Sequence, residues 1–255
     1  MNILVCVKRV PATGGRIVLT PDGQEIDTRY LGFTISPHEE CGVEEAVRIV
    51  EARGGSSAVL TLGPGAAAEQ LRDAMAIGIE RAVLLETDGR EFDAIATAVA
   101  ITAAIREQEA AHGTFDLILF GNEAADTGDF QVGVRVAVAL GRPIVNGIKG
   151  ITVGDGSVTA RREAPGGGWE TYSLPLPAVL GVKEGLNLPR YPSVPGRLRA
   201  RKKEIERIEP AYRPVGPEMI RLRVPVEQTQ EVEILGRGPD AAPRVVEILR
   251  EIGVL

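Results

Sequence analysis

Four short segments contain the residue types that bind nucleotides, and each follows an apolar run or opens a predicted helix. Three are loops, after Val7, after Leu62 and after Phe120, and the fourth is residues 36–39. Helix N-termini offer unpaired N–H groups and a positive dipole end to phosphate. Because ligands of open α/β sheets bind beyond the carboxyl ends of the strands, the pattern predicts a nucleotide pocket built from these segments.

Two of the loops carry glycines that would let the backbone approach a ligand closely. Residues 63–68 follow a loose G-x-G-x-x-A pattern, although a tight strand-to-helix turn has the same composition. Residues 121–129 combine small residues with Asp126 and Thr127, whose side chains form hydrogen bonds. The alternative for this loop is an exposed connection in which Asp129 caps the next helix.

No group of side chains marks an independent catalytic site. His38 is interpreted as a first-turn helix residue near the surface rather than a general base. The glutamates at 39, 40, 44 and 45 are interpreted as helix-dipole partners and a solvated face. Neither a nucleophile triad nor a metal-ligand spacing of the cysteines and histidines is visible. We therefore predict a protein without catalytic activity or a metal of its own.

Composition indicates a globular protein and excludes several classes of partner. The 255 residues are 44% hydrophobic and 25% charged. A formal net charge of −6 and 4% aromatic residues argue against nucleic acid as a partner. Apolar runs stay shorter than the about 18 residues of a membrane span, and the strand-like start lacks the features of a signal peptide. These observations predict a cytoplasmic protein with no membrane span.

Residues 1–186 alternate short apolar runs with longer helical patterns, which is typical of an α/β domain. The predicted fold is an open, mostly parallel sheet with helices on both faces. The predicted strands are residues 3–7, 57–62, 81–86, 117–120, 143–148 and 177–182, and the predicted helices are 37–53, 66–77, 92–111 and 131–140. Hairpins are predicted around residues 21–23, between strands 16–20 and 25–30, and around residues 165–168, between strands 158–163 and 170–176.

Residues 187–255 form a second predicted unit, an extended C-terminal arm. From Arg190 onward the chain is rich in Pro and Arg, and its next predicted core element is an amphipathic helix at 245–252. Residues 190–203 contain several cations and no acid. They are either a solvated tail or a docking strip for an acidic protein surface. A long excursion of this kind is typical of a segment that wraps a partner.

The sequence N-L-P-R-Y-P-S-V-P-G at 187–196, followed by R-A-R-K-K at 199–203, resembles the signature of electron-transfer flavoprotein beta subunits. Leu188 stands where that family usually has an acid. The runs V-C-V-K-R-V-P at 5–11, V-E-E-A at 43–46, L-G-P at 62–64, A-A-D at 124–126 and Q-V-G at 131–133 are also similar to the family, in the same order. The resemblance covers about residues 1–210.

The resemblance implies a heterodimer and an adenine-nucleotide alpha-hydrolase-like fold. FAD would be held mainly by a mobile domain of the alpha subunit. It would carry electrons from acyl-CoA or other dehydrogenases to a quinone reductase or similar acceptor. The beta subunit would bind AMP, or a second FAD in bifurcating members, and the sequence leaves this choice open. It would serve electron transport without catalysing a reaction alone.

The resemblance also implies individual contacts, carried over by position. Ser36 replaces a frequent Asn, and His38 replaces a residue near the flavin that is often bulky and apolar. Val194 stands where the family has a Leu that anchors dehydrogenases, and Glu163 where an acid steadies the flavin domain. The implied nucleotide-binding residues are Cys6, Ser36, Pro37, His38, Glu39, Leu62, Gly63, Gly121, Asn122, Glu123, Ala124, Ala125, Asp126, Thr127, Gly128, Asp129, Phe130, Gln131 and Val132. The implied partner-binding residues are Glu163, Arg190, Tyr191, Val194, Pro195, Arg197 and Leu198.

Two other classes are compatible with a nucleotide-binding α/β domain. An ATP-pyrophosphatase-type ligase would need a phosphate loop of the form S-G-G-x-D-S after the first strand, where this chain reads K-R-V-P-A-T-G. A stand-alone nucleotide sensor of the universal-stress type would be much shorter and would not need residues 190–203. The sensor is the alternative to the electron-carrier interpretation.

Overall fold

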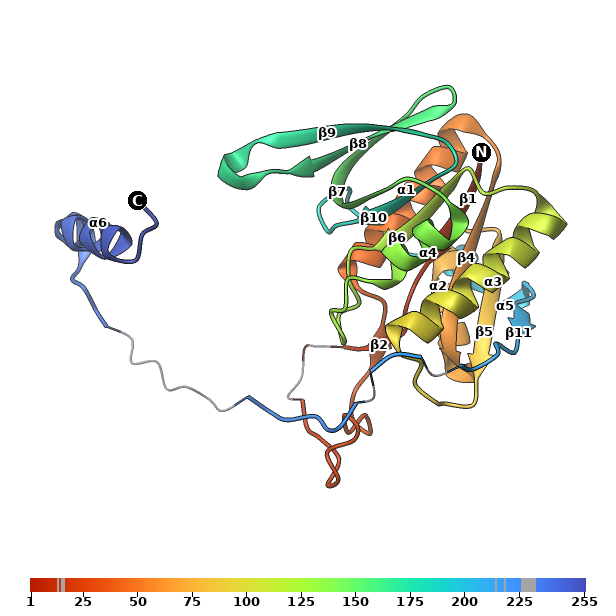
Figure 1. The fold of residues 1–255 in the computed structure, drawn as a ribbon, viewed down its shortest axis with the longest axis horizontal. Coiled ribbons are helices and arrows are strands. Elements are labelled where there is room, and N and C mark those ends of the chain that lie inside the picture. Colours follow the sequence, from red (N-terminus) through yellow and green to blue (C-terminus); the bar gives the residue numbers. More distant parts are fainter. Residues whose placement is uncertain (13, 15–16, 214, 218, 226–232) are drawn as a thin grey trace.

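The computed structural model describes the chain except residues 13, 15, 16, 214, 218 and 226–232. Its body is a nine-stranded sheet with the order β11-β5-β4-β1-β6-β10-β7-β8-β9 (Figure 1). The strands from β11 to β7 in this order are parallel, and β8 and β9 are antiparallel additions. The prediction of an open, mostly parallel sheet is confirmed. The strands are β1 (Asn2–Cys6), β4 (Ser56–Pro64), β5 (Arg81–Thr87), β6 (Leu117–Gly121), β7 (Ile144–Val153), β8 (Ser157–Glu163), β9 (Trp169–Pro175), β10 (Ala178–Val182) and β11 (Glu206–Ile208).

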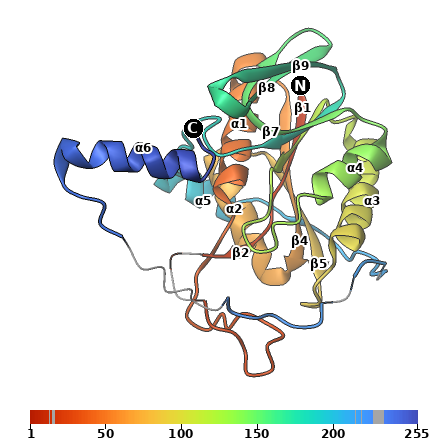
Figure 2. The same ribbon diagram turned by 60° about the vertical axis from the view of Figure 1, so that its left-hand side comes forward.

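Helices cover both faces of the sheet, as Figures 1 and 2 show. One face packs against α1 (Pro37–Arg53) and α2 (Ala68–Ile77). The other packs against α3 (Ala94–His112) and α4 (Val132–Leu140). Strand residues alternate between the two cores: in β1, Ile3 and Val5 belong to the first and Leu4 and Cys6 to the second. The remaining helices are α5 (Val194–Lys202), α6 (Ala242–Glu251) and the 3₁₀ turns η1 (Gly65–Ala67), η2 (Pro165–Gly167) and η3 (Gly238–Ala241).

The start of α1 follows from local sequence. The Ser36 hydroxyl accepts a hydrogen bond from the Glu39 N–H, and the Glu39 carboxylate accepts one from the Ser36 N–H. This capping box satisfies N–H groups that a helix end otherwise leaves unpaired. Pro37 occupies the first helical position, where its missing N–H costs nothing. The helix begins where the sequence predicts.

The strand order reverses at β1, which creates a crevice. β1 pairs with β4 on one side and with β6 on the other, both in parallel. The chain therefore moves outward from β1 in opposite directions across the sheet. In such sheets ligands bind beyond the carboxyl ends of the strands at the reversal point. The ends of β1, β6 and β10 meet there.

Both predicted hairpins are present in the described residues. β8 and β9 form the second, and β8 also pairs with the distal half of β7. The first consists of one antiparallel bridge, Leu19 to Ile26, with Thr20 donating to the Glu25 carbonyl. Arg16, its predicted first residue, lies outside the described residues. A two-stranded sheet of β2 (Val10–Pro11) and β3 (Phe33–Thr34) flanks this hairpin.

The prediction that no core element follows Arg190 before the last helix is wrong. α5 packs against α2, with Ala200 buried, and β11 extends the sheet edge beside β5. The close packing depends on Gly196, since a Cβ there would lie 2.4 Å from the Ala76 carbonyl oxygen. α5 contains few apolar residues, so hydrophobic periodicity does not reveal it. Its contact with α2 supplies the stability that the pattern lacks.

The C-terminal helix α6 lies away from the sheet in both views (Figures 1 and 2). It contains no buried residue, and its apolar side chains Val245 and Val246 are exposed. Of the helices in the described part of the chain, none has both the length and the apolar character needed to cross a membrane.

Candidate functional site

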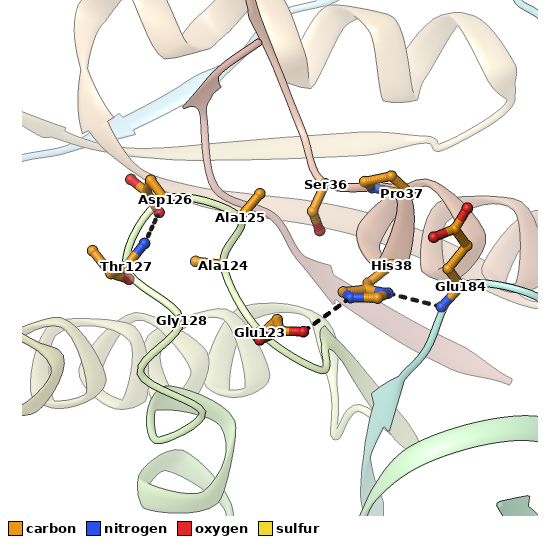
Figure 3. A pocket seen from close by; sticks show the side chains of 10 residues that line it. All are labelled: Ser36, Pro37, His38, Glu123, Ala124, Ala125, Asp126, Thr127, Gly128 and Glu184. Atoms are coloured by element: carbon orange, nitrogen blue, oxygen red, sulfur yellow. Dashed lines mark hydrogen bonds and ion pairs between the residues drawn. The ribbon is translucent and has the colours of Figure 1, made fainter. Parts of the chain in front are cut away.

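A hollow of about 410 Å³ opens at the carboxyl ends of β6 and β10, beside the start of α1 (Figure 3). Its size falls within the roughly 300–1,000 Å³ of small-molecule sites. Because it lies next to the reversal point of the sheet, its position matches the general rule for α/β ligand sites. The hollow is lined by Ser36, Pro37, His38, Glu123, Ala124, Ala125, Asp126, Thr127, Gly128 and Glu184.

Two of the four segments that the sequence predicts line the hollow, and a third, the loop after Val7, reaches its rim through Lys8, which pairs with Asp126. The opening of α1 and the loop after β6 face each other across the hollow (Figure 3). Glu184, which follows β10, is a lining residue that the sequence interpretation missed. A signal for it existed, since residues 177–182 were predicted to be a strand and its carboxyl end had to reach the same edge.

Other predicted contacts lie outside this hollow. Cys6 and Glu39 are buried beside it, and Leu62 and Gly63 end β4, on the far side of β1. Asp129, Gln131 and Val132 are not among the lining residues, and Gly121 lies next to Glu39 below the loop. Contact of these residues with a nucleotide stays a prediction. A second hollow of about 440 Å³ is lined by Asn122, Phe130, Asn146, Gly147, Arg162, Glu163, Pro165, Glu170 and Lys183.

The buried carboxyl group of Glu39 joins the loop after β1 to the start of α1. One oxygen accepts a hydrogen bond from the Lys8 N–H at 2.8 Å, and the other accepts from the Ser36 N–H at 2.8 Å. A Cβ at position 121 would lie 2.7 Å from Cγ of Glu39. The glycine at the end of β6 therefore makes room for this carboxylate, which fixes the loop after β1 against the start of α1.

Burial controls the protonation of this region. It raises the pKa of Glu39 to about 8, although the hydrogen bonds from Ser36 and Lys8 oppose the shift. Burial also raises the pKa of the Cys6 thiol, and the nearby Glu39 adds to the effect. Since only a thiolate is a strong nucleophile, Cys6 is an inert core residue.

We expect Glu39→Gln to change how stability depends on pH. In the wild type the pKa of Glu39 is about 8 when folded and 4.5 when exposed. The folded state therefore retains a proton that the unfolded state releases, and this contribution is complete below pH 4.5 and declines up to pH 8. Relative to the variant, the wild type should lose on the order of 3 kcal/mol across that window. Urea titrations of both proteins at pH 5, 6.5 and 8 measure the difference; parallel curves would contradict the assignment.

His38 joins three segments of the rim. Its Nδ1 accepts a hydrogen bond from the Glu184 N–H at 2.8 Å, and its Nε2 lies 3.4 Å from a Glu123 carboxylate oxygen (Figure 3). Because a backbone N–H points at Nδ1, the ring proton lies on Nε2, facing Glu123. The His38 side chain is partly buried in the first turn of α1 and links the loops after β6 and β10 to this helix.

The charged side chains that line the hollow are carboxylates, which suit the hydroxyls of a ligand better than its phosphate. Carboxylates of Glu123, Asp126 and Glu184 line it and can accept hydrogen bonds from sugar hydroxyls. The N-terminus of α1 is closed by its own capping box. α4 begins at Val132, its N-cap residue Gln131 makes no side-chain capping hydrogen bond, and its first turn contains no acid. Among the described residues no group of His, Cys, Asp or Glu side chains could hold a metal ion.

A second surface lies around α5. Tyr191, Val194 and Leu198 are exposed apolar residues, and the Ser193 hydroxyl caps the helix by accepting from the Gly196 N–H. Pro195 lies in the first turn. These predicted partner-binding residues therefore share one surface segment, which we call the α5 surface.

The α5 surface is anchored to α1 by the residues that precede it. The Arg190 guanidinium pairs with Glu44 at 2.9 Å and Glu51 at 2.7 Å. Asn187 donates from Nδ2 to the Cys41 carbonyl and to Glu45. Arg190 is thus engaged within the chain, and a direct contact with a partner stays a prediction.

The other two predicted partner residues also form pairs. Arg197 lies 3.1 Å from Asp73 of α2. Glu163 pairs with Lys149 at 2.8 Å and lines the second hollow. Both are exposed enough to exchange these pairs for contacts with another protein.

Comparison with known proteins identifies a matching family and similar sequences. Residues 25–212 match the family described as electron transfer flavoprotein domain. "Electron transfer flavoprotein subunit beta" of Bacillus subtilis is 35% identical over 82% of this chain and 79% of its own length. The protein of the same name from Syntrophomonas wolfei is 36% identical over 80% of this chain and 78% of its own. The mitochondrial beta subunit of Oryza sativa is 33% identical over 82% of both chains.

Proposed function

We propose two roles for this chain, which belongs to the electron transfer flavoproteins as a beta subunit. It binds an adenine nucleotide in the hollow at the rim of the sheet, and it docks dehydrogenases through the α5 surface. As a beta subunit it works in electron transfer together with an alpha subunit. The family model covers residues 25–212, which include the α/β domain from β3 onward, α5 and β11. Membership therefore supports the electron carrier over the stand-alone nucleotide sensor.

The nucleotide is AMP or a second FAD, and the observation that carries this proposal is the position of the hollow at the reversal point of the sheet. The residues fit such a ligand. Ala124 and Ala125 leave room for it, and the lining carboxylates can accept hydrogen bonds from ribose hydroxyls. The FAD held mainly by the alpha subunit supplies the redox chemistry, while this chain binds and orients.

We expect Ala125→Trp to weaken nucleotide retention, because its side chain fills the hollow. Overpacking of an ordered site costs about 1–3 kcal/mol, which corresponds to a loss of about 5- to 150-fold in affinity. The measurement is acid extraction of the purified heterodimer followed by chromatographic identification of the released nucleotides. Ala139→Trp, on the exposed side of α4, is the matched control and should retain the wild-type content. Equal content in all three proteins would refute the site.

The docking proposal rests on the exposed apolar side chains of the α5 surface. The partners are acyl-CoA or other dehydrogenases as donors and a quinone reductase or similar acceptor. Apolar side chains that fill a partner's pocket usually contribute most of the binding energy of such interfaces. The exposed apolar side chains of α6 are available for contact with the alpha subunit, and we propose that residues 187–255 serve partner recognition.

A further inference from the structure

Lys8 lies at the rim of the hollow but is not among the nucleotide-binding residues named above. It directly follows β1, and its N–H donates to the buried Glu39 carboxylate at 2.8 Å. Its ammonium lies 2.7 Å from the Asp126 carboxylate in the loop after β6. Since β1 and β6 are neighbouring parallel strands, this ion pair spans the crevice at the reversal point.

The Lys8 ammonium can separate from the Asp126 carboxylate without leaving that carboxylate unpaired. The side chains of Lys8 and Asp126 are 37% and 20% exposed, and ion pairs this accessible to water are weak. Asp126 also accepts a hydrogen bond from the Thr127 N–H at 2.8 Å, so its carboxylate keeps a partner without Lys8. The backbone of Lys8 stays fixed by Glu39. Movement is therefore confined to a flexible side chain.

The charge of the hollow shows why an ammonium is needed. Glu123, Asp126 and Glu184 line it, and each repels a phosphate. Of the ion pairs within the described part of the chain, Lys8–Asp126 is the one in which a Lys or Arg meets a lining residue. A nucleotide phosphate near these carboxylates requires a compensating cation, and Lys8 is in position to supply it.

We propose that Lys8 is the counter-ion of the bound nucleotide: its ammonium exchanges the Asp126 carboxylate for a phosphate of the ligand. This inference rests on the proposed nucleotide site and names the group that recognises the ligand's charge. The group that Lys8 recognises is a phosphate monoester or a pyrophosphate, and AMP and FAD each contain one of these. A nucleoside without phosphate offers Lys8 no such group.

The test is calorimetric titration of the heterodimer, freed of exchangeable nucleotide, with AMP, FAD and adenosine. Lys8→Met should lower the binding affinity for AMP, FAD or both by about 10- to 100-fold, as expected for the loss of a charged hydrogen bond. The affinity for adenosine should stay unchanged. Lys8→Arg should retain most of the affinity, since the charge is kept. Equal weakening of all ligands by Lys8→Met, or no weakening, would overturn the proposal.

Asp126→Asn distinguishes ligand binding from a structural role of the ion pair. If Lys8 acts on the phosphate, Asp126→Asn, which keeps an acceptor oxygen for a ribose hydroxyl, should weaken AMP binding much less than Lys8→Met does. If the pair only holds the two loops together, Asp126→Asn should weaken AMP as much as Lys8→Met, which contradicts the proposal. A wild-type protein that binds none of the ligands would refute the nucleotide site itself. Binding that is indifferent to Lys8 would refute only this inference.

Discussion

Val194→Asp is expected to slow electron transfer from a donor dehydrogenase by at least about tenfold, while flavin content and fold stay unchanged. Val194 opens α5 and is 72% exposed, with exposed Tyr191 and Leu198 nearby. A carboxylate placed in an apolar pocket of the partner must lose its water, which is far more costly than the loss of a methylene. Steady-state rates at increasing concentrations of the heterodimer, with an acyl-CoA dehydrogenase as donor, measure the effect.

Val138→Asp is the matched control for this experiment. Val138 is 73% exposed, but it lies on α4, on the opposite face of the sheet from α5 (Figure 1). Its substitution introduces the same charge at the same exposure and should leave the rate unchanged. Equal slowing by both variants, or wild-type kinetics with Val194→Asp, would show that dehydrogenases do not dock on the α5 surface.

Arg190→Ala should lower the free energy of unfolding by about 2 kcal/mol, because it leaves the Glu44 carboxylate without its main partner. Glu44 is 1% exposed. Burial alone would raise its pKa, but hydrogen bonds from Arg190 and Arg48 outweigh burial and hold the pKa below its usual value. Breaking a fully buried pair costs about 3–5 kcal/mol. The loss here is smaller, since Arg190 is 38% exposed and Arg48 remains 2.7 Å from Glu44.

The control for Arg190→Ala is Arg197→Ala, in the same segment. Arg197 and Asp73 are both more than half exposed, so breaking their pair should change stability by less than about 0.5 kcal/mol. Urea unfolding followed by circular dichroism compares the two variants. Because Arg190 lowers the pKa of Glu44 and Glu51, its stabilising effect is present above the ordinary carboxyl pKa of 4.5 and is lost as pH falls through the lowered values. Equal stability of both variants would show that Arg190 does not anchor the α5 surface.

The order of elements in the α/β domain could be predicted because local patterns specify it. Apolar runs, the Ser36 cap and the turn at residues 21–23 each act over a few residues. α5 and β11 could not be predicted in the same way. Their stability comes from contacts distant in sequence, Gly196 against α2 and β11 against β5. A periodicity argument does not register such contacts.

The candidate site could likewise be predicted only in part. That strand ends meet at one edge is a general property of parallel sheets, and it identified residues 36–38 and 123–128. Which strands are neighbours is a tertiary property. Because β4 lies on the far side of β1 from β6, Leu62 and Gly63 fall outside the hollow. β6 lies between β1 and β10, and this arrangement brings Lys8 to Asp126 and places Glu184 in the lining of the hollow.

Native mass spectrometry of the intact heterodimer tests most directly whether the rim hollow binds an adenine nucleotide. We expect a mass equal to the two chains, one FAD and one further adenine nucleotide, either AMP or a second FAD. Collisional release should then identify which of the two is bound. A mass equal to the two chains and a single FAD, with no other nucleotide, would contradict the account.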